Sequence, residues 1–198
     1  FITGVCSRTC FYCPVGDHKF GKDVIFANER PVLEIQDVFL EVEACGATGA
    51  GVTGGDPLCR VERCVEYVSA LKNKYGKSFH IHLYTPLELV NPHTMKLLYD
   101  AGLDEIRLHF DLDTDKCWDH APAALAYEWV VGVEIPAIPA YEIQTKKLID
   151  FISGKVAFLN LNELEVADNK QSLLLDRGYT TKDAYSYGVL GSTAFALA

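Results

Sequence analysis

No stretch of this 198-residue chain approaches the roughly 18 consecutive apolar residues that a membrane-spanning helix requires. Its first residues, Phe-Ile-Thr-Gly-Val, lack the basic segment that begins a secretory signal peptide, so none is expected. Basic residues are also few, since 18 Lys and Arg stand against 27 Asp and Glu. The resulting net charge of −9 disfavours a nucleic-acid substrate, and together these absences predict a soluble cytoplasmic protein.

A disulfide framework is also missing. The seven cysteines are odd in number, three of them stand in one short loop, and the other four are scattered at Cys45, Cys59, Cys64 and Cys117. We interpret the scattered four as buried free thiols suited to a reducing cytosol, with an auxiliary metal cluster as the less favoured alternative.

The length and the composition, with 49% hydrophobic and 23% charged residues, predict one globular domain over residues 1–198. The chain does not open on Met, and the apolar run from Thr193 to its end has no helix stop signal. We therefore expect a domain that is trimmed at its N-terminus, and a cut C-terminus as well.

The most informative feature that is present is a cysteine loop, in which Cys6, Cys10 and Cys13 have the spacing Cys-x3-Cys-x2-Cys. Three thiolates at this spacing can bind three corners of a four-iron cluster, and without a fourth cysteine in the run one iron stays open for chemistry. A zinc site is the alternative, with His18 as the fourth ligand.

A glycine-rich motif follows further along the chain and reads Gly51-Val52-Thr53-Gly54-Gly55-Asp56-Pro57-Leu58. Glycines at the end of a strand allow the backbone to approach a ligand closely. An ordinary turn between a strand and a helix is the alternative for this motif taken alone.

The cysteine loop, with the aromatic Tyr12 directly before Cys13, resembles the signature of the radical S-adenosylmethionine (radical SAM) enzymes. The resemblance implies a [4Fe–4S] cluster whose fourth iron is chelated by S-adenosylmethionine. The cluster ligands implied are Cys6, Cys10 and Cys13.

The glycine motif is similar to the Gly-Gly-Glu-Pro stretch of the same family, whose backbone holds the amino group of the cofactor's methionine. The resemblance implies this role for Thr53, Gly54 and Gly55. It also places Asp56 at the cofactor, although the family usually has Glu there and the Asp side chain is one methylene shorter.

Strand-like and helix-like segments alternate along the chain. Strands are predicted at 1–5, 49–53, 79–84, 105–110, 130–135 and 156–161. Helices are predicted at 32–44, 61–75, 91–102, 115–129 and 143–152, with weaker ones near 171–176 and after Thr181. Repeated β–α units predict an α/β fold with parallel strands, and the count agrees with the partial (β/α)6 TIM-like barrel that the resemblance implies.

Four of these strands have one apolar and one polar face, because side chains alternate with period two. The apolar faces must meet the helices, so the polar faces are predicted to line a chamber for a polar ligand, open at the carboxyl ends of the strands. By position we assign cofactor contacts to Arg107, His109, Glu134 and Asn160, with hydrogen-bonded structural roles as the alternative.

By resemblance, the expected reaction is reductive cleavage of S-adenosylmethionine to a 5′-deoxyadenosyl radical, which abstracts hydrogen from a substrate that the sequence does not name. The layout looks most like the pyruvate formate-lyase activating enzyme branch. A glycyl-radical enzyme or a peptide is therefore the expected substrate, and flavodoxin or ferredoxin is the expected electron donor, under anaerobic conditions.

A non-catalytic iron–sulfur or zinc protein, used for interaction or electron transfer, is the alternative. Replacing Gly54 and Gly55 together by Ala is expected to separate the two, because only an enzyme would lose cofactor cleavage.

Overall fold

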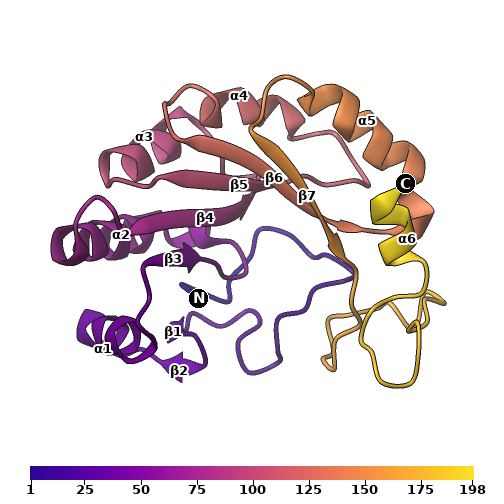
Figure 1. Cartoon of the computed structure of the whole chain (residues 1–198), viewed down its shortest axis with the longest axis horizontal. Coiled ribbons are helices and arrows are strands. Elements are labelled where there is room, and N and C mark those ends of the chain that lie inside the picture. The colour runs from indigo at the N-terminus through magenta and orange to yellow at the C-terminus, as the bar shows by residue number, and fades with distance from the viewer.

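The computed structural model describes residues 1–198 and is built on a five-stranded parallel sheet whose strand order follows the chain. The strands are β3 (Gly49–Val52), β4 (His80–Pro86), β5 (Glu105–His109), β6 (Val130–Ala137) and β7 (Phe158–Glu163). The sheet curves as an open arc, with helices along its outer side and the N-terminal segment on its inner side (Figure 1). This is the predicted α/β architecture of a partial barrel.

Helices connect consecutive strands of the sheet, as the β–α pattern predicted, and one further helix precedes β3 and another follows β7. They are α1 (Ile35–Cys45), α2 (Val61–Tyr75), α3 (Pro92–Asp100), α4 (Ala121–Ala124), α5 (Glu142–Ile152) and α6 (Ser192–Leu197). The start of α3 follows from local chemistry, because the Asn91 side chain accepts hydrogen bonds from two backbone amides and Pro92 occupies the first turn. No helix is both long enough and apolar enough to cross a membrane.

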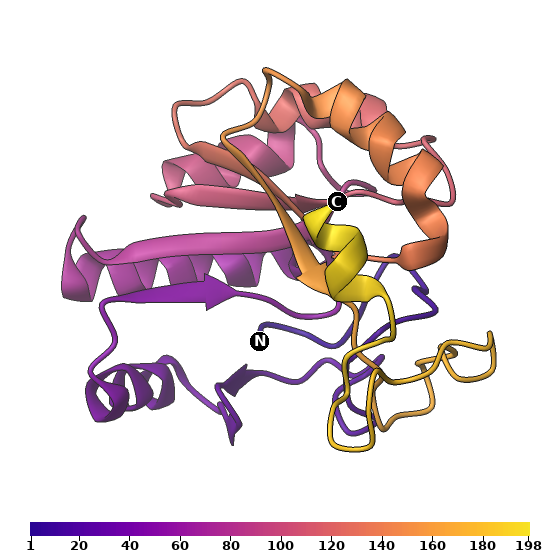
Figure 2. The same cartoon turned by 45° about the vertical axis from the view of Figure 1, so that its right-hand side comes forward.

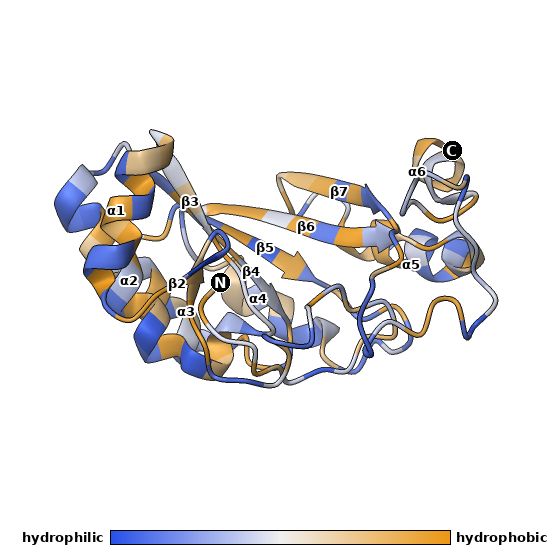
Figure 3. Cartoon of the chain, turned by 90° about the horizontal axis from the view of Figure 1, so that it is seen from below, coloured by the Kyte–Doolittle hydropathy of each residue, from blue (hydrophilic) through white to orange (hydrophobic).

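The core lies between the outer face of the sheet and these helices. Ile81, Leu83, Ile106, Leu108 and Val133 are fully buried, and their polar neighbours in sequence face the other side. Figure 3 shows this alternation as successive hydrophobic and hydrophilic bands along β5 and β6. The prediction of one apolar and one polar face is therefore confirmed for β4, β5 and β6, whereas no residue of β7 is fully buried on either face.

The N-terminal segment differs from the prediction, because residues 1–5 do not form a regular strand. The segment is held beside the end of β3 instead: Ile2 N donates to Thr53 O at 2.7 Å, and Gly55 N donates to Thr3 O at 2.8 Å. The sheet consequently has five strands, and the cysteine loop begins directly against the glycine motif. A two-stranded antiparallel pair, β1 (Phe26–Ala27) with β2 (Arg30–Pro31), follows this loop.

Two helix predictions were wrong, and a third, for a helix over 115–129 broken by Pro122, holds only in part. The segment 115–129 forms only a short 3-10 turn and the four-residue α4, and no helix forms at 171–176 or directly after Thr181. The segment between β7 and α6 instead folds back over the cysteine loop, where Leu173 N donates to Phe11 O at 2.6 Å (Figure 2). Local periodicity cannot predict a long-range contact of this kind. The terminal helix α6 was not predicted.

Candidate active site

A cavity of about 720 Å3 lies at the carboxyl ends of the strands and joins the cysteine loop to the glycine motif. Its volume is typical of small-molecule sites. The predicted site residues in its wall are Cys6, Cys10, Tyr12, Cys13, Thr53, Gly54, Gly55, His109 and Glu134. Asp56, Arg107 and Asn160 are not in the wall, and their side chains lie behind it.

The three thiols of the cysteine loop are only partly exposed. Burial is the largest influence on each of them and raises their pKa, that of Cys6 to about 11. The free thiols are therefore protonated at neutral pH, and binding of a metal must displace these protons.

The distances between the three thiols can be compared with those that a zinc ion would require. Only one group of three metal-ligating side chains has all its donor atoms within 4.8 Å of one another, and it does not include the cysteines. A single tetrahedral zinc ion, with Zn–S distances of about 2.3 Å, would need its sulfur ligands about 4 Å apart. The more open triplet fits a cluster, in which each thiolate binds a different iron.

The glycines of the second motif are required by the cysteine loop itself. A Cβ atom on Gly54 would lie 2.5 Å from the carbonyl oxygen of Thr3, and one on Gly55 would lie 2.5 Å from that of Val5 and 2.9 Å from Cβ of Cys6. Both glycines line the cavity, but the crowding on their Cα atoms comes from the N-terminal segment. Their absent side chains therefore let the cysteine loop pack against the end of β3.

Asp56 is completely buried behind the Gly-Gly pair. Its carboxylate accepts hydrogen bonds from the Ser7 hydroxyl at 2.8 Å, the Thr85 hydroxyl at 2.9 Å and the Leu58 amide at 3.0 Å. Burial outweighs these bonds and raises the pKa of Asp56. The structure thus places this carboxylate as a brace between the cysteine loop, β4 and the turn that precedes α2.

Tyr12 and His109 form one fixed unit in the cavity wall. His109 Nδ1 lies 2.9 Å from the carbonyl oxygen of Glu134, and Nε2 lies 2.9 Å from the Tyr12 hydroxyl. A carbonyl can only accept, so Nδ1 carries the hydrogen and Nε2 accepts from Tyr12. Burial, followed by the charge of Arg8, lowers the pKa of His109 to about 4, which keeps the ring neutral at pH 7.

The Glu134 carboxylate is held from behind by three donors. Arg107 and Asn160 donate to Oε2 at 2.9 and 3.1 Å, and Asn162 donates to Oε1 at 2.9 Å. Burial opposes ionisation of Glu134, but these three bonds outweigh it and lower the pKa of the carboxylate. Arg107 and Asn160 thus position an ionised carboxylate at the cavity.

The sequence matches the model of the radical SAM superfamily over residues 1–130. The chain belongs to the radical SAM superfamily. It is 40% identical over its whole length to a protein of Methanocaldococcus jannaschii named "putative glycyl-radical enzyme activating enzyme", of which it covers 55%. It is also 30% identical to an FO synthase of Mycobacterium tuberculosis over 53% of this chain and 13% of that protein. The chain thus spans about half the length of the first relative and a small part of the second.

The radical SAM cofactors fit the residues that are present. Three soft thiol ligands suit iron–sulfur binding, and the adjoining cavity carries the polar groups that a charged nucleoside such as S-adenosylmethionine requires. The other four cysteines do not line this cavity, so the loop offers three cysteine ligands.

Two residues that support this candidate site were not predicted. Arg8, with a 9% exposed side chain, donates to the carbonyl oxygen of His109 at 3.2 Å and lies 3.2 Å from Asp111. Asn169 donates to the carbonyl oxygens of Cys13 and Val15 at 3.0 and 3.2 Å. An arginine inside the cysteine triplet was a usable signal, whereas nothing local marks Asn169.

Proposed function

We propose that this chain is the catalytic core of a radical SAM enzyme that activates a protein of the glycyl-radical type. The observation that supports this most directly is the convergence of the cysteine loop, the glycine motif and the strand-end polar groups on one cavity. When bound, the [4Fe–4S] cluster and S-adenosylmethionine supply a 5′-deoxyadenosyl radical that abstracts a hydrogen atom from the substrate.

The chain's own residues then hold and orient the cofactors. Cys6, Cys10 and Cys13 are the cluster ligands, and the backbone at Thr53, Gly54 and Gly55 forms the adjoining edge of the S-adenosylmethionine site. The Glu134 carboxylate, fixed by Arg107 and Asn160, is an acceptor for hydroxyl or ammonium groups of the cofactor. Tyr12 and neutral His109 form a rigid wall that limits where the cofactor lies.

The proposed substrate and partners follow from the relative. The M. jannaschii protein is named for activation of a glycyl-radical enzyme and aligns with the whole of this chain, which favours a protein or peptide substrate. The reaction needs a low-potential electron, for which flavodoxin or ferredoxin in an anaerobic, reducing cytoplasm is the proposed source. Because the chain spans about half of that relative, the substrate assignment belongs to the proposal.

The decisive experiment is anaerobic reconstitution with iron and sulfide, followed by dithionite and S-adenosylmethionine, with 5′-deoxyadenosine measured by chromatography. We expect about four irons per chain and formation of 5′-deoxyadenosine, both lost in Cys13→Ala. Cys45→Ala is the matched control, because Cys45 is exposed and does not line the cavity. A cluster that never cleaves S-adenosylmethionine would refute the enzyme, and zinc bound in place of a cluster would refute the site.

The substrate class is tested separately by electron paramagnetic resonance. The reconstituted protein, dithionite and S-adenosylmethionine are mixed with a candidate glycyl-radical enzyme, and a stable carbon-centred radical on that partner is the expected result. If 5′-deoxyadenosine forms but no partner radical appears with any glycyl-radical enzyme tested, the enzyme class stands and the substrate assignment fails.

A further inference from the structure

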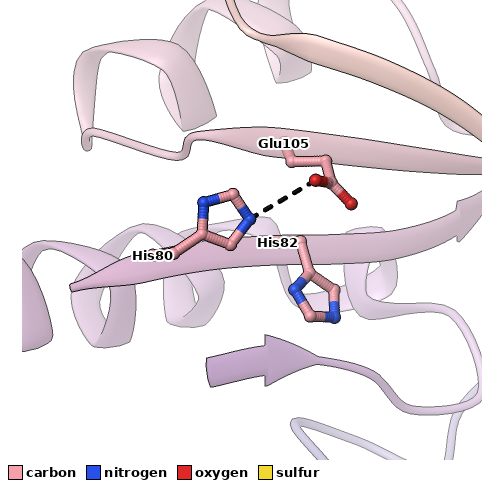
Figure 4. A group of neighbouring side chains, drawn as sticks. All are labelled: His80, His82 and Glu105. Carbon is pink, nitrogen blue, oxygen red and sulfur yellow. Dashed lines mark ion pairs between the residues drawn. The ribbon is translucent and has the colours of Figure 1, made fainter. Parts of the chain in front are cut away.

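A second group of metal-ligating side chains lies at the opposite ends of the same strands. His80 is the first residue of β4, His82 follows on the same face, and Glu105 is the first residue of β5. Figure 4 shows the His80 and Glu105 side chains facing each other between these two strands and the His82 ring on the side of β4 that faces β3. The donor atoms of all three lie within 4.8 Å of one another. None of the three lines the cofactor cavity.

The closest pair has the separation expected of two ligands on one ion. His80 Nε2 lies 3.4 Å from Glu105 Oε2, and no hydrogen bond joins them. Two nitrogen or oxygen ligands at about 2.0 to 2.2 Å from a tetrahedral ion lie about 3.4 Å apart. The pair is therefore spaced for a shared metal.

Two of the three ligands, Glu105 and His82, have the supporting contact that metal sites usually provide. Glu105 Oε1 accepts from Arg107 Nε at 2.5 Å, which leaves Oε2 on the side of His80. His82 Nε2 lies 3.2 Å from the Tyr84 hydroxyl, so its other ring nitrogen is available. The second nitrogen or oxygen of a metal-binding side chain commonly takes part in a hydrogen bond that orients the ligand.

The charge and the space around the group also suit a cation. Glu105 and Glu134 both contact Arg107, so these three side chains carry one net negative charge. A Cβ atom on Gly51 would lie 2.7 Å from His82 Nε2, so this glycine makes room for the ring over β3.

We propose that His80, His82 and Glu105 bind a divalent transition-metal ion of the zinc type, with its remaining coordination position open to solvent. Two imidazoles and one carboxylate form a ligand set typical of such ions. The His80 side chain is 50% exposed, which provides an entry path. The site is separate from the cysteine loop and does not depend on the function proposed above.

The test uses the cluster-loaded protein, desalted and titrated anaerobically with zinc sulfate in a calorimeter, with zinc X-ray absorption on the one-to-one complex. We expect one zinc per chain with only nitrogen and oxygen ligands at about 2.0 to 2.2 Å. His80→Ala should weaken binding by more than about tenfold, the smallest loss typical of removing even a supporting residue. Since His80 is half exposed, this variant should keep its circular dichroism spectrum.

Controls distinguish this site from others that could take zinc. His93→Ala removes an exposed histidine on α3 and should leave the zinc affinity unchanged. Glu105→Gln should weaken binding even if His80→Ala is partly compensated by water. Sulfur scattering at about 2.3 Å would locate the zinc on cysteines and overturn the proposal. Undiminished affinity in both variants, or no zinc bound, would overturn it as well.

Discussion

Replacing Asp56 by Ala is expected to lower the free energy of unfolding by about 2 to 4 kcal/mol. The buried carboxylate accepts three hydrogen bonds, from Ser7, Thr85 and the Leu58 amide. Losing Asp56 as the cap of the turn that precedes α2 costs about 1 kcal/mol. Leaving buried donors without a partner adds about 1 to 3 kcal/mol.

Asp56→Asn is the matched variant, because it keeps the shape and removes the charge. Its carbonyl oxygen can still accept from Leu58 and Thr85, and the Ser7 hydroxyl can turn to accept from the amide. Burial raises the pKa of Asp56, so the charge itself costs stability in the folded state. We expect the Asn variant to unfold within about 1 kcal/mol of the unaltered protein at pH 7.

The assay is thermal unfolding of the cluster-free, thiol-reduced chain, followed by circular dichroism. For a chain of this size 1 kcal/mol corresponds to about 2 to 4 °C in Tm, so the Ala variant should melt roughly 5 to 15 °C lower. Because the folded pKa of Asp56 lies above 3.8, its contribution to stability is greatest below pH 3.8 and falls as the pH rises through the folded pKa. The Asn variant should therefore gain relative to the unaltered protein as the pH rises.

Two results would refute this reasoning. If the Ala and Asn variants melt together, the three hydrogen bonds do not brace the fold. If the Asn variant melts normally but its reconstituted form loses affinity for S-adenosylmethionine, Asp56 belongs to the cofactor site, as the sequence motif first indicated.

Three further predictions concern the surroundings of the cysteine loop. The His109 ring has a pKa of about 4 in the folded protein, whereas the unfolded ring takes up a proton below about pH 6.5, so the folded protein loses stability as the pH falls from 6.5 to 4. His109→Gln should reduce this loss. Acid unfolding curves that coincide for the variant and the unaltered protein would contradict this. Arg8→Met should lower the free energy of unfolding, measured in urea, by about 1 to 3 kcal/mol, because the partly buried carboxylates of Glu88 and Asp111 lose their charged partner. An unchanged midpoint would show that the ion pairs contribute nothing. Asn169→Ala should speed the loss of cluster absorbance in air, because the carbonyl oxygen of Cys13 loses its hydrogen bond from the Asn169 side chain. Gln171→Ala is the control and should not change the rate. Equal rates in both variants would exclude a role for the segment between β7 and α6 in protecting the cluster.

Much of the fold could be predicted because its signals are local. The bounds of α2 were predicted correctly from helical spacing and a terminal glycine, and the start of α3 from Asn91 and Pro92. Strict alternation in β4, β5 and β6 gave the polar inner face, and with it the position of His109 and Glu134. Each of these features depends on residues within a few positions of one another.

The remaining features depend on contacts between distant segments. Residues 1–5 were predicted as a strand, but their partners lie at Thr53 and Gly55, and they form too few bonds for a regular ladder. The cover over the cysteine loop depends on Asn169 and Leu173, which lie more than 150 residues from the loop backbone that they contact. No periodicity in the sequence connects such distant positions. Weak helices were therefore predicted where the structure has a segment that covers the cysteine loop.

The Gly54 and Gly55 pair illustrates how a sequence motif can suggest an unsuitable experiment. The double Ala change was expected to remove cofactor cleavage and to leave a scaffold intact. The Cβ atoms would instead collide with the carbonyl oxygens of Thr3 and Val5, so the change would displace the cysteine loop in an enzyme and in a scaffold alike. Measuring 5′-deoxyadenosine with the unaltered, cluster-loaded protein separates these two possibilities more directly.

The length of the polar inner face bears on how many ligands it serves. From His80 to Pro86, β4 rises about 20 Å, at roughly 3.3 Å per residue. Only the last three residues of β4 line the cofactor cavity, so a cofactor at the carboxyl end does not account for polar side chains at the start of the strand.

An exposed edge could be polar without any ligand, but Glu105 is 8% exposed and the ring of His82 lies over a glycine that makes room for it. Burying a carboxylate beside two histidines is costly unless charge is balanced there, and the salt bridge to Arg107 occupies only one of its oxygens. The second oxygen lies 3.4 Å from His80 Nε2 with no hydrogen bond between them, which leaves it free to bind a cation at the amino end of the sheet.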